Sequence, residues 1–132
     1  MLRAQLLVLQ GDWTAALALI DDHLPRSEPA WAARMQAPVR ADRAWCLWHL
    51  GRREEERQDI AHARHALSHG PCDVDDRALA QARMAQVLEA SGEREAAQRL
   101  RDAAEVSWTQ YKADQLALST LLDLAIGDLQ PA

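Results

Sequence analysis

The fold of this chain follows from a pattern that occurs three times, in LVLQGDWTAAL (residues 7–17), LWHLGRR (residues 47–53) and LEASGEREAA (residues 88–97). Each stretch contains an apolar helix end, one glycine and the polar start of a new helix. The glycines Gly11, Gly51 and Gly92 are separated by 40 and 41 residues. A fixed period in this range is typical of a solenoid of helical hairpins, in which each repeat packs on the next.

Composition predicts an all-α fold. The 132 residues are enough for one domain, and 48% of them are hydrophobic. Alanine supplies about a fifth of the chain, and the mixture of alanine with leucine, glutamate, arginine and glutamine is strongly helix-forming. Residues that favour strands are scarce.

The net charge indicates which classes of partner to expect, and the cysteines and the N-terminal residues indicate the cellular compartment. The net charge is −5, so we expect no nucleic-acid or anionic-membrane surface, and the partner is a protein, a peptide or a small molecule. Cys46 and Cys72 are too few for a secreted disulfide framework. Gln5, Gln10 and Asp12 interrupt the apolar N-terminal run that a signal peptide would need. These features predict a cytoplasmic protein.

Helix start and stop signals divide the chain into three hairpins and a last helix, at about residues 1–25, 27–70, 73–112 and 114–127. Gly70 and Pro71 form the clearest stop, where we expect a left-handed C-cap. Ser27 is the expected cap of the second hairpin, whose first helix Pro38 should kink or split. The last helix is either a continuation of the third hairpin or a separate capping helix that Gly127 ends.

The hairpins resemble the tetratricopeptide repeat family. In that family the turn glycine is followed by a small residue five positions later and a large apolar residue nine positions later. The matching residues are Ala16 and Ile20 after Gly11, Ala97 and the neighbouring Leu100 after Gly92, and Ile60 after Gly51. Glu56 replaces the small residue of the middle repeat, and the period exceeds the usual 34. The longer period is similar to that of bacterial regulators and sensors, and the short first hairpin is that expected of a fragment of a longer array.

The resemblance implies a non-enzymatic scaffold of a bacterial regulatory or assembly protein, which binds a peptide or helix in a concave groove. The first helix of each hairpin would line that groove, through Gln5, Val8, Leu9, Ala41, Trp45, Trp48, His49, Arg83, Gln86 and Glu89. These positions lack the Lys and Asn with which family members hold a partner's C-terminal carboxylate. We therefore expect no carboxylate clamp of that kind.

Trp45 and Trp48 are separated by three residues and share one helical face. Tryptophan offers a large apolar area with one hydrogen-bond donor, as binding hot spots do, so the pair can form a recognition platform. The same two residues can instead be core between helices. The sequence leaves both interpretations open.

The alternative function is a ligand- or metal-responsive sensor domain. Its candidate ligands are His62, His65, His69 and Cys72, which could form a tetrahedral set. The three histidines lie opposite the apolar stripe of their helix, so an exposed polar face explains them better and we assign no metal site. The chain has no phosphate-binding loop, nucleophile elbow or metalloprotease motif, and we predict neither an enzyme nor a cofactor.

The C-terminal helix is apolar on two sides. One stripe, expected to close the solenoid, contains Leu118, Leu121, Leu122, Ala125 and Leu129. The other side contains Ala113, Leu116 and Leu124. A capping helix needs only one apolar face, so the second side predicts a homodimer through this helix.

Overall fold

The computed structural model describes residues 2–129, which form six α-helices and one short 3₁₀-helix. The elements are α1 (Leu2–Leu9), α2 (Trp13–His23), η1 (Leu24–Arg26), α3 (Pro29–His49), α4 (Arg53–His69), α5 (Val74–Ala90) and α6 (Arg94–Leu129). The described part of the chain contains no strand, so the all-α prediction is confirmed.

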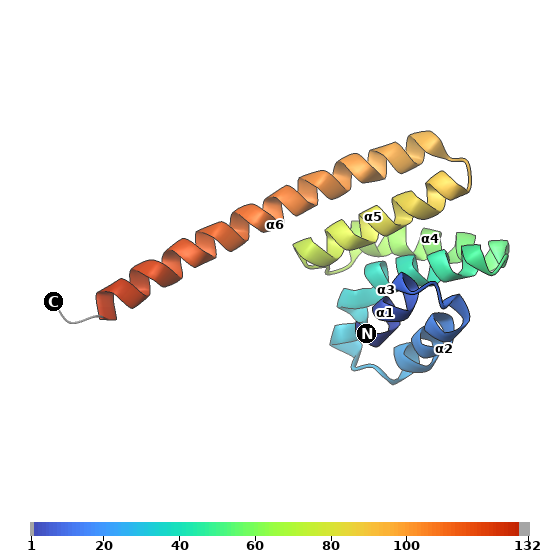
Figure 1. Ribbon diagram of the computed structural model, residues 1–132, viewed down its shortest axis with the longest axis horizontal. Helices are drawn as coiled ribbons and strands as arrows, with labels where there is room; N and C mark the ends of the chain where they lie inside the picture. The colour runs from blue at the N-terminus through green and yellow to red at the C-terminus, as the bar shows by residue number, and fades with distance from the viewer. Residues whose placement is uncertain (1, 130–132) are drawn as a thin grey trace.

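Successive helices pair as α1 with α2, α3 with α4, and α5 with α6 (Figure 1). The pairs are joined by contacts of α3 with α2 and with α5. Ala37, Ala41, Ala44, Ala63 and Ala80 belong to the largest core cluster, which spans α3 to α6. Small side chains at these positions let the helix axes approach closely. The alanines therefore contribute to core packing as well as to helix propensity.

The three repeated glycines end their helices in the same way. Gly11, Gly51 and Gly92 have φ of 76°, 75° and 86°. In each turn the glycine amide donates to the carbonyl three residues back, and the following amide donates to the carbonyl five residues back, at 2.9 Å. This is the left-handed helix end that the sequence pattern predicts.

Gly70 differs from these glycines, and the prediction of a left-handed cap there is wrong. Its φ is −102° and its ψ 165°. The reason is Pro71, whose ring restricts the preceding residue to extended conformations. Helix α4 still ends at this point because the chain turns into the extended region after the Gly70 amide has bonded to the Ala66 carbonyl.

The start of α3 also differs from expectation. Glu28, not Ser27, caps the helix, since its carboxylate accepts hydrogen bonds from the amides of Ala30 at 3.1 Å and Trp31 at 2.9 Å. Ser27 instead donates to the His23 carbonyl of the previous helix. Pro38 does not split α3, which runs unbroken past it.

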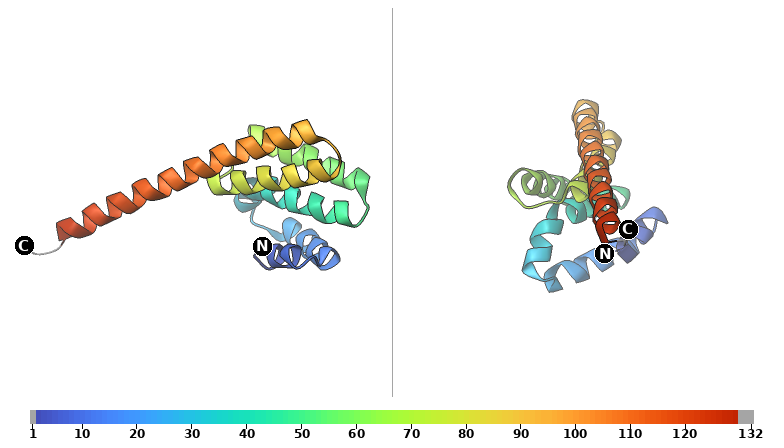
Figure 2. Two further views of the ribbon diagram at one scale, coloured as in Figure 1. Left: turned by 45° about the horizontal axis from the view of Figure 1, so that its top comes forward. Right: turned by 90° about the vertical axis from the view of Figure 1, so that its left-hand side faces the viewer.

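Helix α6 is one continuous helix of 36 residues, so the separate capping helix is ruled out and Gly127 lies inside α6. Its partner α5 has 17 residues, and α6 projects far beyond it (Figures 1 and 2). Every residue from 112 to 129 is exposed. The prediction that the leucine stripe closes the hairpin stack is therefore wrong, because none of the other helices between residues 2 and 129 covers this part of α6.

Candidate functional site

A hollow of about 590 Å³ opens across α1, α3, α5 and the start of α6. It contains four of the residues expected in the groove, Gln5, Leu9, Arg83 and Gln86. The other lining residues are Pro38, Asp42, Leu79, Ala82 and Arg101. Its walls come from the first helix of each helix pair, α1, α3 and α5, together with Arg101 of α6.

Charged side chains at this hollow are paired with one another. The Asp42 carboxylate accepts from Arg83 Nε at 3.0 Å, and Arg83 also donates to Gln86 at 2.6 Å. Arg101 pairs with Glu89, another expected groove residue, at 3.2 Å. Burial raises the pKa of Asp42, and the opposing effect of Arg83 is smaller. The charges thus fix the walls in place and are not free to bind an ion.

The unpaired surface of the hollow is apolar. Leu9 is 78% exposed and Leu79 is 56% exposed, from α1 and α5 respectively. Gln5 adds an amide that can donate and accept hydrogen bonds. This combination of apolar contacts and a few amide groups suits a peptide segment better than a charged metabolite.

The tryptophans expected in the groove lie instead in an aromatic cluster at the Gly51 end of α3. The His49 ring stacks on Trp13 with centroids 3.8 Å apart, and lies edge-on to Trp45 at 4.4 Å and to Trp48 at 5.0 Å. Partial burial lowers the pKa of His49. Trp45 packs against two of the core clusters, so it has a core role.

Trp48 is half-buried, and unlike Trp45 it is not among the residues that pack against the core clusters. Its buried indole N–H has no hydrogen-bond acceptor among the described residues. The guanidinium of Arg53 lies 4.9 Å from the ring centroid, within cation–π distance. Two other expected groove residues, Val8 and Ala41, are fully inside the core.

A buried ion network joins three helices, and the sequence analysis did not identify it. Asp59 of α4 has a side chain only 2% exposed. It accepts from Arg40 at 3.1 Å and from Arg43 at 2.7 Å, both from α3. Arg43 also bonds to Asp21 of α2 at 2.8 Å. Although burial disfavours its charged form, these hydrogen bonds hold the pKa of Arg43 above its usual value.

The candidate metal ligands do not converge. His62, His65 and His69 are exposed on α4, and the rings of His65 and His69 stack with centroids 4.4 Å apart. Within residues 2–129 no three His, Cys, Asp or Glu side chains are placed to hold a metal ion. Cys46 is fully buried, and this burial raises the pKa of its thiol to about 12.

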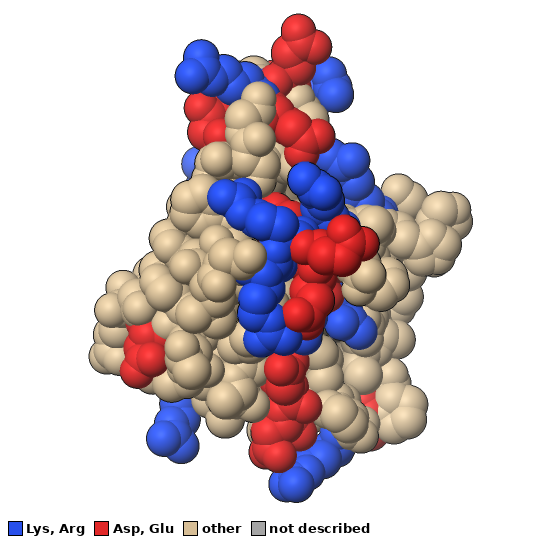
Figure 3. Space-filling view, turned by 90° about the vertical axis from the view of Figure 1, so that its right-hand side faces the viewer, with Lys and Arg blue, Asp and Glu red and all other residues tan. Residues whose placement is uncertain are grey.

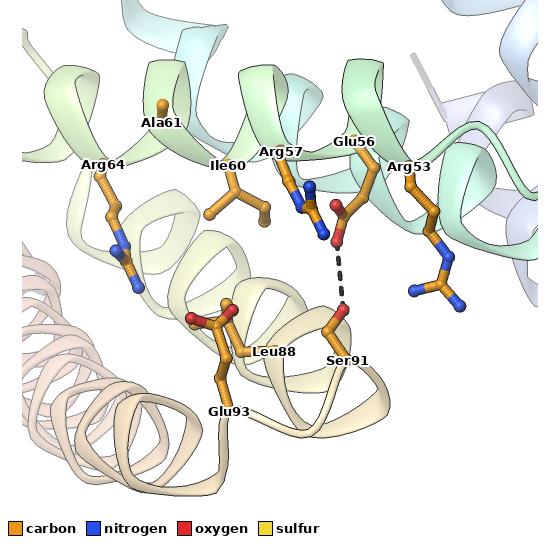
Figure 4. A pocket seen from close by; sticks show the side chains of 9 residues that line it. All are labelled: Arg53, Glu56, Arg57, Ile60, Ala61, Arg64, Leu88, Ser91 and Glu93. Atoms are coloured by element: carbon orange, nitrogen blue, oxygen red, sulfur yellow. Dashed lines mark hydrogen bonds between the residues drawn. The ribbon is translucent and has the colours of Figure 1, made fainter.

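A second cavity, of about 470 Å³, lies between α4 and the turn that joins α5 to α6 (Figure 4). Arg53, Arg57 and Arg64 project into it from one face of α4. Its floor includes Glu56, only 4% exposed, which accepts a hydrogen bond from Ser91 at 3.3 Å. Burial raises the pKa of Glu56. Figure 3 shows basic and acidic side chains interleaved across the end of the molecule that carries the helix turns, with the basic ones gathered near the middle of this face.

No family model matches the chain, and neither the curated proteins nor the solved structures give a match. A search of residues 2–129 finds no helix with both the length and the apolarity to cross a membrane.

Proposed function

We propose that this chain is a non-enzymatic helical-repeat module, similar to tetratricopeptide repeats, which binds a peptide or helix of a partner protein in the hollow across α1, α3 and α5. The main support for this proposal is that the first helix of each of the three hairpins contributes residues to the lining of one hollow. Three matching glycine turns, each followed by a new helix, support the solenoid arrangement.

The lining indicates the chemistry of the bound segment. An apolar side chain fits between Leu9 and Leu79, where two exposed leucines face one hollow. Gln5 and Gln86 can bond to the main chain of the segment on either side. The acidic and basic groups here are already paired, so a segment of low charge is favoured over a terminal carboxylate.

The two free cysteines support a reducing, cytoplasmic compartment. By the same family resemblance, we assign the module to a bacterial regulatory or assembly protein.

The experiment is affinity capture with variants of the hollow. Leu79→Glu places a charge among the apolar contacts, while Val106→Glu makes the same change at an exposed site of α6 outside the hollow. A stoichiometric partner should be captured by the wild type and by Val106→Glu but not by Leu79→Glu. Equal capture by all three proteins, with helicity unchanged, would assign recognition to another surface.

The projecting half of α6 supports a second proposal, that two copies associate through it. Leu118, Leu121, Leu122 and Leu129 are each at least half exposed. They continue the face that buries Ala97, Ala104 and Ser107 against α5. Beyond α5 this face has no helix to cover it, and a contiguous apolar stripe of this kind marks an association site.

Self-complementarity of the stripe selects a second copy as the occupant. If two α6 helices run antiparallel about a two-fold axis near Thr120, Leu118 meets Leu122 of the other copy and Tyr111 meets Leu129. The two contacts repeat on both sides of the axis. The apolar stripe on which Leu118 lies is wider than the side with Leu116 and Leu124, so we assign the interface to the wider stripe.

A further inference from the structure

The cavity between α4 and the α5–α6 turn is lined by three arginines of α4, and two carboxylates, those of Glu56 and Glu93, face the same space. Most other arginines that line or cross helix contacts are paired, among them Arg40, Arg43, Arg83 and Arg101. By contrast, Arg53, Arg57 and Arg64 form no ion pair or side-chain hydrogen bond among residues 2–129. All three are exposed. Arg53 lies over the Trp48 ring. Burial raises the pKa of the nearby Glu56 carboxyl, and the charges of Arg53 and Arg57 lower that pKa by less.

The cavity adjoins a second hollow that reaches α6, with which it shares one lining residue. Arg64 also lines a smaller hollow of about 260 Å³ together with Ala96, Arg99 and Leu100. Arg99 is likewise without an ion pair among the described residues. A chain of net charge −5 therefore places four guanidinium groups, against two carboxylates, around two adjoining hollows between α4 and the α5–α6 hairpin, which together we call the cleft.

The floor of the cleft decides what kind of anion fits. Ile60 and Leu88 supply apolar surface between Arg57 and Arg64 (Figure 4). The buried carboxyl of Glu56 lies at the same floor, so a small anion placed deep in the cavity would meet a like charge. Glu93 lines the opposite side of the cavity, at the α5–α6 turn, and repels anions there. Negative groups must therefore bind at the α4 side of the rim, with an apolar group of the same ligand beneath them.

We propose that this cleft binds an acidic segment of a partner protein, in which carboxylates on both sides of an apolar residue pair with Arg57 and Arg64. These two arginines are separated by seven residues, or about 10 Å along the helix. Carboxylates three residues apart in an extended chain span about the same distance. The site shares no lining residue with the hollow across α1, α3 and α5, although α5 and α6 contribute to both.

The test is fluorescence anisotropy with a labelled peptide of repeated Glu-Ala-Leu-Glu and a matched peptide of repeated Lys-Ala-Leu-Lys. The net charge of the chain favours the basic peptide, whereas the cleft favours the acidic one. We expect the acidic peptide to bind more tightly, and Arg57→Gln with Arg64→Gln to weaken it about tenfold. Raised salt should weaken the binding as well.

The control variant is Arg3→Gln with Arg34→Gln, which removes the same charge from exposed positions outside the cleft. It should bind the acidic peptide as the wild type does, and circular dichroism should show that both variants keep their helices. Three results would overturn the proposal: no preference for the acidic peptide, equal loss in both variants, or inorganic polyphosphate binding at the cleft when the peptide does not.

Discussion

Asp59 has almost no access to water, and two arginines of α3 neutralise its charge. Removing one charge of a buried ion network leaves the opposite charges without a partner. The resulting loss of stability is larger than the net stabilisation that the intact network provides. We expect Asp59→Asn to lower the free energy of unfolding by about 3 kcal/mol, since Arg40 and Arg43 keep some solvent contact. Thermal denaturation checks this, with the exposed Glu54→Gln as a control that should change stability by less than about 0.5 kcal/mol.

Neutralising Glu56 should stabilise the protein, in contrast to neutralising Asp59, and the size of the gain should depend on pH. Burial raises its pKa in the folded protein above the ordinary value of 4.5, so the folded state holds its proton more tightly than the unfolded state. The contribution of Glu56 to stability is therefore complete below 4.5 and is lost as pH rises through the raised pKa. Glu56→Gln keeps an acceptor for Ser91 and should stabilise the protein by about 1 kcal/mol or less near neutral pH.

Denaturant unfolding at several pH values measures this difference. The gain of Glu56→Gln should shrink as pH falls towards about 4. A gain that is the same at all pH values would show that packing, not ionisation, separates the two proteins.

At the level of single residues, helix phase predicted part of the groove lining, whereas Val8, Ala41 and Trp45, counted from the same glycines, belong to the core. Counting back from the turn glycines brought Gln5, Arg83 and Gln86 together, and they line one hollow. The partners of Asp59 are 16 and 19 residues away, so only the packing of α3 on α4 reveals them. Trp13 joins its aromatic cluster for the same reason, because its contact with His49 crosses from α2 to α3.

At the level of helices, a glycine at a turn and a glycine inside a helix should respond differently to substitution by alanine, because only the turn glycine has a positive φ. Gly51 has a φ of 75°, and a Cβ added there would meet no atom within 4 Å. The cost of Gly51→Ala is therefore backbone strain alone, about 1–2 kcal/mol. Gly127 lies inside α6 in open space, so Gly127→Ala should raise helicity near the end of α6 and leave global stability unchanged.

Thermal denaturation and circular dichroism of the two variants measure these effects. Equal changes of the unfolding midpoint in Gly51→Ala and Gly127→Ala would contradict the expected difference in stability between the two variants.

The helix ends at Gly11, Gly51 and Gly92 were predictable because a positive φ favours glycine, whereas the end of α6 was not. Gly11, Gly51 and Gly92 are each followed by a helix that packs back on the preceding one, whereas no such helix follows Gly127 among the described residues, so the chain continues through it as helix.

At the level of the whole molecule, the length of α6 relative to α5 leaves an apolar stripe without a partner helix among the described residues. The 36-residue α6 leaves its last turns beyond the 17-residue α5, with Leu118 and Leu122 exposed to solvent. The sequence showed that this segment is apolar on two sides, but whether it folds back depends on a tertiary partner that the local pattern does not encode. Burying such a stripe removes apolar surface from water, at about 25 cal/mol per Å², so a second copy is stabilising at high protein concentration.

We expect light scattering to report a dimer for the wild-type chain and a monomer for Leu118→Glu with Leu122→Glu. Because both residues are exposed, the substitutions should leave the thermal stability of the hairpins unchanged, which separates loss of association from loss of folding. The matched control is Leu116→Glu with Leu124→Glu, on the other side of α6, which should remain a dimer. A wild-type chain that stays monomeric at high concentration would contradict the interface, and dissociation of the control alone would move it to the side with Leu116 and Leu124.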